Sequence, residues 1–241
     1  MLRPRRPSVL FLSVCLALFS LIGAAATNAE TASRPSEGAV HDADTAPTAS
    51  ASSPSTPSTP SVTPTAVVER LHAGLLRSMT EANELGFQGR FDYLRPVVEE
   101  NFDLGFMGSK SVGRHWKKLT PEEQQVWLDK FTGFLAANYA GNFNAYDGES
   151  FHTLGEQPAK RETRVVLTEL RVPSKENVIL NYRLRETPDG WKIIDIYLKG
   201  TVSELALRRS DFASTLKEKG FQDLAAAVDR KILELRNKEG G

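Results

Sequence analysis

Residues 177–212 read NVILNYRLRETPDGWKIIDIYLKGTVSELALRRSDF, and the rest of the chain is interpreted around this stretch. Apolar and polar side chains alternate over residues 178–184 and again over residues 191–198, which is the pattern of β-strands with one apolar face. Between the two runs, Pro188 fixes φ and Gly190 is free to take a positive φ, as a tight turn requires. The stretch therefore predicts an antiparallel hairpin. The side chains predicted to share its apolar face are Val178, Leu180, Tyr182, Leu184, Ile194, Ile196 and Leu198.

The segment before the hairpin is predicted to be mainly helical. A first helix is expected to begin at Thr65 as its cap residue, and a second to span residues 91–101. Residues 103–107 are interpreted as a bend, and a short helix is expected to follow through residues 112–116.

The clearest helix start is Thr-Pro-Glu-Glu at residues 120–123, where a cap residue is followed by Pro and then by Glu at the third helical position. The helix is expected to run to about Tyr139. Apolar and aromatic side chains recur on one stripe of this helix, which predicts a buried face. The members of the stripe are Trp127, Phe131, Phe134, Leu135 and Asn138, and Leu128 and Tyr139 widen it.

Two further strands are predicted, a weak one at residues 150–155 and a better one at residues 163–172. After the hairpin, residues 201–204 match a capping box that starts a helix ending at Gly220, and a last helix is expected over residues 222–235. Helices followed by an antiparallel sheet of about four strands and then by helices predict an α+β domain.

The N-terminal part is predicted to be an export signal followed by a linker. Arginines near the start precede an apolar run and then small residues, which is the pattern of a signal peptide over residues 1–29. The alternative is an uncleaved anchor, because the apolar run is just long enough to span a bilayer. Residues 30–64 are rich in Ser, Thr, Pro and Ala and are predicted to be a disordered linker. The folded domain is then residues 65–241.

Composition excludes several function classes. Lys and Arg together number 30, as do Asp and Glu, and no basic stripe with interleaved aromatics stands out, so nucleic acid is not predicted as a partner. The only cysteine, Cys15, lies in the apolar N-terminal run, so the mature chain would hold no disulfide, cysteine nucleophile or thiolate metal site. No histidine has a neighbour at metal-ligand spacing, and no metal or other cofactor is predicted. The histidines are His41, His72, His115 and His152.

Several motifs in and around the hairpin resemble those of the MlaC / toluene-tolerance auxiliary family of periplasmic lipid-binding proteins. They are Tyr-Arg-Leu at 182–184, Gly-Trp-Lys-Ile-Ile-Asp-Ile at 190–196, Gly-Thr-Val-Ser at 200–203, Arg-Ser-Asp-Phe at 209–212, Val-Gly-Arg-His-Trp at 112–116 and Thr-Pro-Glu-Glu-Gln at 120–124. Lys199 and Thr201 depart from the Glu and Val common in the family. With residues 203–209, these departures look closer to its hopanoid-associated HpnM branch.

The resemblance implies a curved antiparallel sheet with helices packed on it around an apolar cavity for acyl chains. It implies a carrier in the periplasm that transfers phospholipid between the inner and outer membranes. Its partners would be an inner-membrane lipid transporter and an outer-membrane lipoprotein complex. The HpnM branch would add hopanoid as a ligand.

Ten side chains are the candidates for contact with a lipid, because a carrier needs an apolar pocket and no catalytic group. They are Trp116, Phe131, Phe134, Leu135 and Tyr139 from the helices, and Val166, Leu180, Tyr182, Ile194 and Ile196 from the sheet. For any one of them taken alone an ordinary place in the core is the favoured interpretation, because core and pocket stripes look alike in sequence, and only the family resemblance favours a pocket for the set.

Two other functions stay open at this point. Asp195, between Ile194 and Ile196, would be a general base if it pointed into an apolar cavity, as in a small-molecule enzyme on a cone-shaped α+β fold. Alternation places it on the opposite face, which favours a structural role such as a bond to Arg183 or to a helix amide. A structural envelope adaptor with a filled core is the third possibility.

Overall fold

The computed structural model describes residues 62–173 and 175–238. The predicted signal peptide and residues 30–61 of the predicted linker lie outside the described residues. No helix in the described part of the chain has the length and apolar character needed to cross a membrane.

The strands form one antiparallel sheet in which each strand pairs with its neighbours in the sequence. They are β1 (Ser150–Ala159), β2 (Thr163–Arg171), β3 (Val178–Thr187), β4 (Gly190–Leu198) and β5 (Val202–Ser203). The predicted hairpin is β3–β4, and Gly190 has the expected positive φ of 95°. The short strand β5 was not predicted, and β1 is longer than the weak signal at residues 150–155 indicated.

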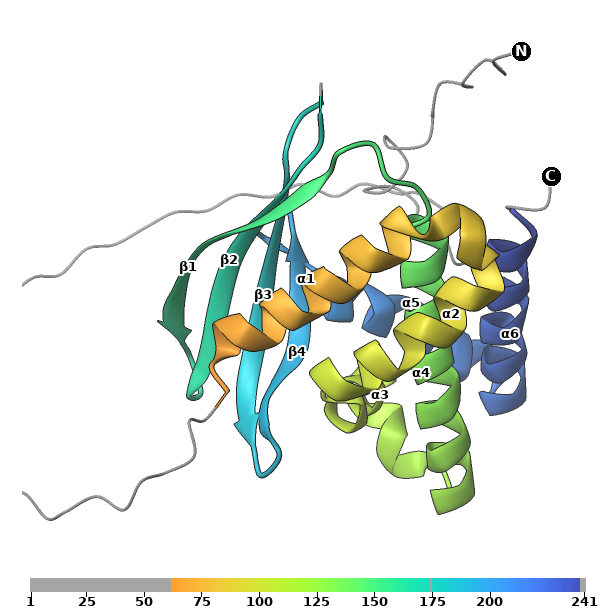
Figure 1. The fold of residues 1–241 in the computed structure, drawn as a ribbon. Helices are drawn as coiled ribbons and strands as arrows, with labels where there is room; N and C mark the ends of the chain where they lie inside the picture. The colour runs from red at the N-terminus through yellow and green to blue at the C-terminus, as the bar shows by residue number, and fades with distance from the viewer. Residues whose placement is uncertain (1–61, 174, 239–241) are drawn as a thin grey trace, which may run out of the picture. The chain divides into compact units, whose positions relative to one another are not determined.

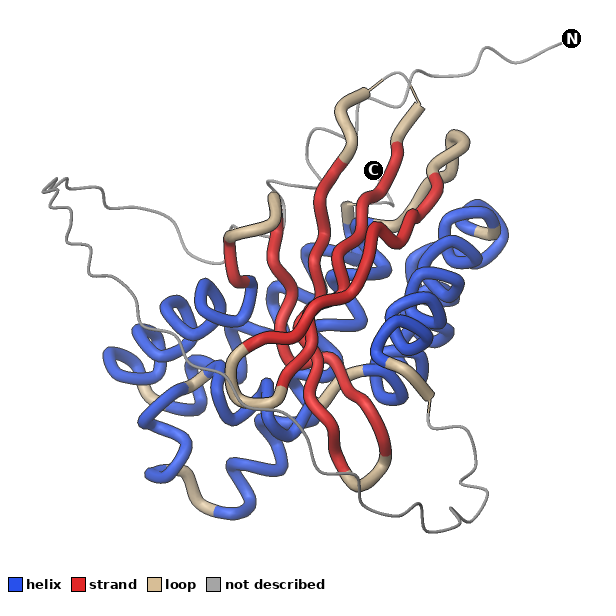
Figure 2. Tube along the Cα trace, turned by 90° about the vertical axis from the view of Figure 1, so that its left-hand side faces the viewer, coloured by secondary structure: helices blue, strands red, loops and turns tan. Residues whose placement is uncertain are grey.

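Helices precede and follow the sheet, and the α+β class is confirmed. They are α1 (Pro64–Thr80), α2 (Ala82–Asn101), α3 (Leu104–Ser111), the 3-10 helix η3 (Gly113–Lys118), α4 (Pro121–Asn142), α5 (Glu204–Lys219) and α6 (Phe221–Asn237). Helix α1 lies across the sheet, and α4 and α6 run beside each other (Figure 1). In Figure 2 the strands lie in front of the helices, so one face of the sheet packs on helices, and we call it the inner face.

Two predicted helix starts were wrong. The cap of α1 is Thr63, whose hydroxyl accepts a hydrogen bond from the Ala66 amide, whereas the Thr65 hydroxyl donates to Glu156. At α5, Ser203 is the cap residue and accepts from the Ala206 amide, so the box predicted to begin at Thr201 does not form.

Residues 103–107, expected to be a bend, instead begin a helix. The Asp103 carboxylate accepts a hydrogen bond from the Phe106 amide at 2.9 Å and caps α3. The capping box at α4 is confirmed: the Thr120 hydroxyl and the Glu123 carboxylate each accept from the other residue's amide. Asp103 thus fixes where the chain leaves α2 and begins the helix beside the hairpin.

A β-bulge in β4 changes which side chains face the helices. Arg183 pairs with Asp195 and Leu184 pairs with Ile193, so Ile194 is an extra residue between the two pairs. The bulge places Ile193 in the core, where it is fully buried. Strict alternation across residues 191–198 had placed Ile194 on the inner face and Ile193 on the opposite face.

Candidate functional site

An apolar cavity of about 80 Å³ lies between α4, the start of α5 and the inner face of the sheet. The strand wall comes from β2, β3 and β4, with Tyr182 opposite Ile196 and Leu180 opposite Leu198 in the β3–β4 ladder. The helix wall comes mainly from the aromatic stripe of α4. The cavity is therefore built by the two elements that the sequence signalled most clearly.

The helix wall is held in place by aromatic packing and by buried hydrogen bonds of Trp127. Trp127 Nε1 donates to the Gly108 carbonyl at 2.9 Å, which ties α4 to α3. The rings of Trp127 and Phe134 both meet Phe212 of α5 edge to face, at centroid distances of 5.1 and 5.6 Å. These contacts orient α4 so that its remaining apolar side chains point at the sheet.

Most of the predicted contact residues come together at this cavity. Its lining includes Phe131, Phe134, Leu135, Tyr139, Leu180, Tyr182 and Ile196. It also includes apolar side chains outside the predicted set, namely Met107, Phe143, Leu170, Val178, Leu198 and Leu205. That these side chains contact a lipid remains a prediction.

Three predicted residues lie elsewhere. Trp116 is half-buried in η3 and packs against the core. Val166 is fully buried opposite Tyr182 and does not line the cavity. Ile194, displaced by the bulge, lines a different hollow together with Asp195. For Ile194 the prediction failed because the bulge reverses the alternation on which it rested.

The cavity contains polar atoms that sequence analysis missed. Tyr139 Oη, Asn142 Nδ2 and Glu204 Oε1 are buried and have no hydrogen-bond partner among the described residues. Burial raises the pKa of the Tyr139 hydroxyl and of the Glu204 carboxyl. Asn138 and Asn142, four residues apart on an otherwise apolar stripe, were the available sequence signal. Unpaired polar atoms in an apolar hollow are places where water or a polar group of a ligand would bind.

Glu204 and Arg208 form the polar end of the cavity on α5. The Arg208 Nη2 to Glu204 Oε2 distance is 3.5 Å, and both side chains are nearly buried. The Arg208 guanidinium also lies 5.1 Å from the centroid of the Phe134 ring. Desolvation lowers the pKa of Arg208. The pair thus joins the first turn of α5 to the aromatic wall of α4.

The cavity is small for a lipid. Its volume of about 80 Å³ compares with roughly 300–1,000 Å³ for pockets that hold drug-sized ligands. Within the described residues, no hydrogen bond joins α4 to strands β1–β4, and α4 makes its closest helix contacts with α2, α3 and α6. The α4 wall and the strand wall therefore meet through side-chain contacts alone.

Asp195 does not point into the cavity. Its carboxylate accepts hydrogen bonds from Ser203 Oγ at 2.6 Å, the Ile196 amide at 2.8 Å and the Leu205 amide at 3.1 Å. Burial raises the pKa of Asp195, and these bonds oppose that shift. The carboxylate links β4 to the first turn of α5, so its lone pairs are occupied by structural bonds.

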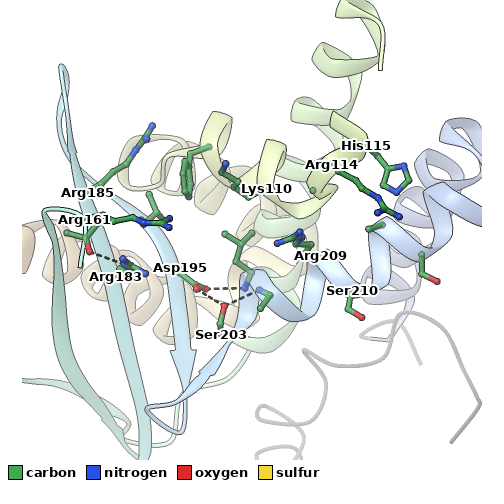
Figure 3. Close-up of a pocket in the computed structure, with 18 of the residues that line it drawn as sticks. Lys110, Arg114, His115, Arg161, Arg183, Arg185, Asp195, Ser203, Arg209 and Ser210 are labelled. Atoms are coloured by element: carbon green, nitrogen blue, oxygen red, sulfur yellow. Dashed lines mark hydrogen bonds between the residues drawn. The ribbon is translucent and has the colours of Figure 1, made fainter. Parts of the chain in front are cut away.

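A second, much larger hollow of about 1,030 Å³ lies on the other side of the hairpin and extends along α3, η3 and α5 (Figure 3). Its lining is strongly basic, and we call it the basic cleft. The cationic side chains of the basic cleft are Lys110, Arg114, Arg161, Arg183, Arg185, Arg209 and Lys217. Asp195 is the only carboxylate among the lining residues.

The fold and the family are both recognisable by comparison. A family model described as "MlaC protein" matches residues 69–230. A phospholipid-binding protein from Ralstonia solanacearum, solved in complex with a phospholipid, is similar with a TM-score of 0.61 and 23% sequence identity. The match covers 71% of this chain and 95% of that one. At this identity the similarity establishes the fold, an antiparallel sheet with helices packed on it.

Proposed function

The chain belongs to the MlaC protein family, and on this premise we propose that it is a non-enzymatic lipid carrier of the periplasm. The single observation that carries the proposal is the apolar cavity between α4 and the β3–β4 hairpin. The similar protein from Ralstonia solanacearum was solved with a phospholipid bound, which supports a phospholipid as one ligand. A hopanoid is the other ligand class that the sequence motifs favour.

The physical need for such a cavity follows from the hydrophobic effect. A lipid with two long tails carries on the order of thirty CH₂ groups, and at about 0.8 kcal/mol each their exposure to water costs roughly 20–25 kcal/mol. A carrier that crosses an aqueous gap must cover most of them. On this proposal the chain moves lipid between the inner and outer membranes, and its partners are an inner-membrane transporter and an outer-membrane lipoprotein complex.

The cavity must widen to admit lipid tails. We infer that α4 moves away from the β3–β4 hairpin on loading, because only side-chain contacts join α4 itself to this wall, whereas the start of α3 is held to β4 by the bond from the Asp103 amide to the Ile193 carbonyl. Tyr139 Oη and Asn142 Nδ2 would then donate hydrogen bonds to an ester or hydroxyl oxygen of the ligand, and Glu204 Oε1 would accept one from a ligand hydroxyl.

One observation favours a second candidate. A cavity of about 80 Å³ is close to a filled interior, which is what a structural envelope adaptor would have. The catalytic alternative has less support, because the Asp195 carboxylate is held by three structural hydrogen bonds.

Native mass spectrometry of the purified full chain separates these functions. The carrier proposal predicts a population whose mass exceeds that of the chain by one lipid, and extraction of that population identifies the lipid. A ligand-free mass after incubation with lipid vesicles would support the adaptor. An Asp195→Asn variant that still folds is expected to retain bound lipid.

A further inference from the structure

The basic cleft concentrates positive charge on a chain whose formal net charge is +0. Two of its arginines have partners: Arg183 donates to Thr163 Oγ1 and to the Lys160 carbonyl, and Arg185 pairs with Asp103. The other cleft cations form no ion pair among residues 62–173 and 175–238. These are Lys110, Arg114, Arg161, Arg209 and Lys217.

The lone carboxylate does not neutralise the basic cleft. The Asp195 oxygens already accept hydrogen bonds from Ser203 and from the Ile196 and Leu205 amides. The surplus of unpaired cations therefore faces solvent, and a concave basic surface attracts anions more strongly than the same charges on a flat one.

Small residues leave room beside these cations. Leu205, Arg209, Ala213 and Lys217 recur every four residues on the face of α5 that lines the cleft. The other α5 residues that line it, Ala206, Ser210 and Ser214, are small. Gly113 has a φ of 58°, and a Cβ at this position would lie 2.9 Å from Arg209 Nε. Glycine thus lets the guanidinium lie against the first residue of η3, at the edge of an open hollow.

The basic cleft and the apolar cavity share a wall. Leu205 lines both, because it follows Glu204 at the start of α5 and lies between the two hollows. The cleft also contains apolar surface from Phe106 and Ile194. A ligand with a charged head and apolar tails therefore finds both environments on either side of one side chain.

We propose that the basic cleft binds the phosphate group of an anionic lipid whose tails occupy the apolar cavity. This inference rests on the proposed carrier function and names a ligand class for it. Arginine presents a planar fork of donors that matches phosphate oxygens. The cleft volume of about 1,030 Å³ is large enough for a whole headgroup as well as for a free phosphate ester, and the two sources share this chemistry.

The test compares two double variants with the same change in charge. Arg209→Gln with Lys217→Gln removes two cleft cations, and Arg230→Gln with Lys238→Gln removes two exposed cations in and next to α6 that do not line the cleft. Each full-length protein is incubated with vesicles of equal phosphatidylglycerol and phosphatidylethanolamine, re-purified, and its bound lipid is quantified. Thermal unfolding confirms that all three proteins are folded.

The wild-type chain is expected to enrich phosphatidylglycerol over phosphatidylethanolamine by roughly five- to tenfold. This factor corresponds to the free energy of one charge-assisted hydrogen bond, reduced because the cleft cations are exposed to solvent. The cleft variant should lose this preference because it binds less phosphatidylglycerol than the wild type, and the α6 variant should keep it. Equal enrichment of phosphatidylglycerol in the wild type and the cleft variant would overturn the proposal. If no protein retains any lipid, the carrier function itself fails.

A second experiment tests whether the phosphate belongs to a lipid headgroup or to a water-soluble phosphate ester. It also tests the phosphate site if no lipid is retained. sn-Glycerol 3-phosphate is titrated into the full chain, and amide shifts near Gly113 and Arg209 are followed by NMR. Shifts that vanish in the cleft variant, without lipid selectivity, would support the phosphate site with a water-soluble ligand. If neither lipid selectivity nor amide shifts are observed, the proposal is overturned, and an acidic protein surface would then be the better partner.

Discussion

The two faces of the β3–β4 hairpin border hollows of opposite character. On the inner face, Leu180, Tyr182 and Ile196 close a narrow apolar cavity of about 80 Å³ against α4. On the outer face, Arg183 and Arg185 border a basic cleft of about 1,030 Å³. One strand pair thus has a dry, nearly closed space on one face and a wet, charged one on the other. The alternation of side chains along β3 contributes to this contrast, and Leu205 of α5 lines both hollows.

The bulge at Ile194 adjusts this division in β4. It places Ile193 in the core beside Leu184 and leaves Asp195 on the cleft side, where its carboxylate holds Ser203 and the first turn of α5. The wall between the two hollows therefore depends on hydrogen bonds from a strand to a helix start as well as on apolar packing.

Removing the hydrogen bonds that Asp195 accepts should have the largest effect on the stability of the chain. Asp195→Ala leaves the Ser203 hydroxyl and two amides without their acceptor, and at about 1 kcal/mol per bond the free energy of unfolding is expected to fall by about 3 kcal/mol. Urea denaturation measures it. Asp195→Asn, which keeps the shape and one acceptor oxygen, is the control and should lose less. Equal stability of the wild type and the alanine variant would show that the wall does not depend on Asp195.

Filling the apolar cavity should abolish most lipid binding and leave the cleft unchanged. Ile196→Trp displaces room for about three methylene groups, and at about 0.8 kcal/mol each the affinity for lipid should fall roughly fiftyfold. Leu154→Trp, at an exposed position on β1, is the matched control. Retained lipid is measured by extraction and mass spectrometry. Unchanged retention in Ile196→Trp would place the tails outside this cavity.

Protonation of His72, which is buried against the inner face, should destabilise the folded chain. His72 on α1 lies against Tyr182, with 3.0 Å between Nε2 and Oη, and stacks on Phe151, and burial lowers its pKa from 6.5 to about 3. Between these values the unfolded chain binds a proton that the folded chain does not, so stability is lost as the pH falls below 6.5. The loss is about 1.4 kcal/mol per pH unit, or about 2 kcal/mol between pH 7 and pH 5.

The measurement for His72 is urea denaturation of the wild type and His72→Gln at both pH values. Glutamine is polar and does not titrate, so the variant should lose about 2 kcal/mol less than the wild type over this interval. Carboxylates titrate in both proteins, and the difference between the two losses isolates the histidine. Equal losses would mean that His72 takes up a proton in the folded chain as readily as in the unfolded chain.

The smallest expected effect concerns the polar atoms within the apolar cavity. Tyr139→Phe removes a buried hydroxyl that has no partner, so the unliganded chain should be as stable as the wild type or more stable by up to about 1 kcal/mol. Affinity for a lipid with an ester or hydroxyl oxygen should fall roughly fivefold, the worth of one hydrogen bond. Thermal unfolding and lipid titration give the two values. A loss of stability without a loss of affinity would assign the hydroxyl to a bound water instead.

The sequence predicted the elements better than their junctions. The hairpin, the capping box at Thr120 and the helix stop at Gly220 follow from local chemistry and are present. Thr63 was missed as the cap of α1, although Pro64 at the first helical position was the available signal. Asp103 was missed because Gly105 suggested a bend. No residue type marks the bulge at Ile194, and it was visible only in the pairing of the strands.

The two hollows differed in how far they could be predicted. The cavity draws on apolar stripes of α4 and β3, whose periodicity is visible in sequence, so Phe134, Leu180 and Ile196 could be chosen in advance. The cleft assembles cations from α3, η3, the β1–β2 turn, β3 and α5, which are scattered through a chain of zero net charge. Only the fold brings them together, and neither composition nor spacing indicated it.

The most direct test of the central claim is to locate lipid tails on the protein. A phospholipid with a diazirine in the middle of one acyl chain is bound to the full chain, irradiated, and the labelled peptides are mapped by mass spectrometry. We expect labels on α4 between Phe131 and Phe143 and on the inner-face residues of β3 and β4. Labels confined to the basic cleft or to α6, or no labels at all, would contradict it.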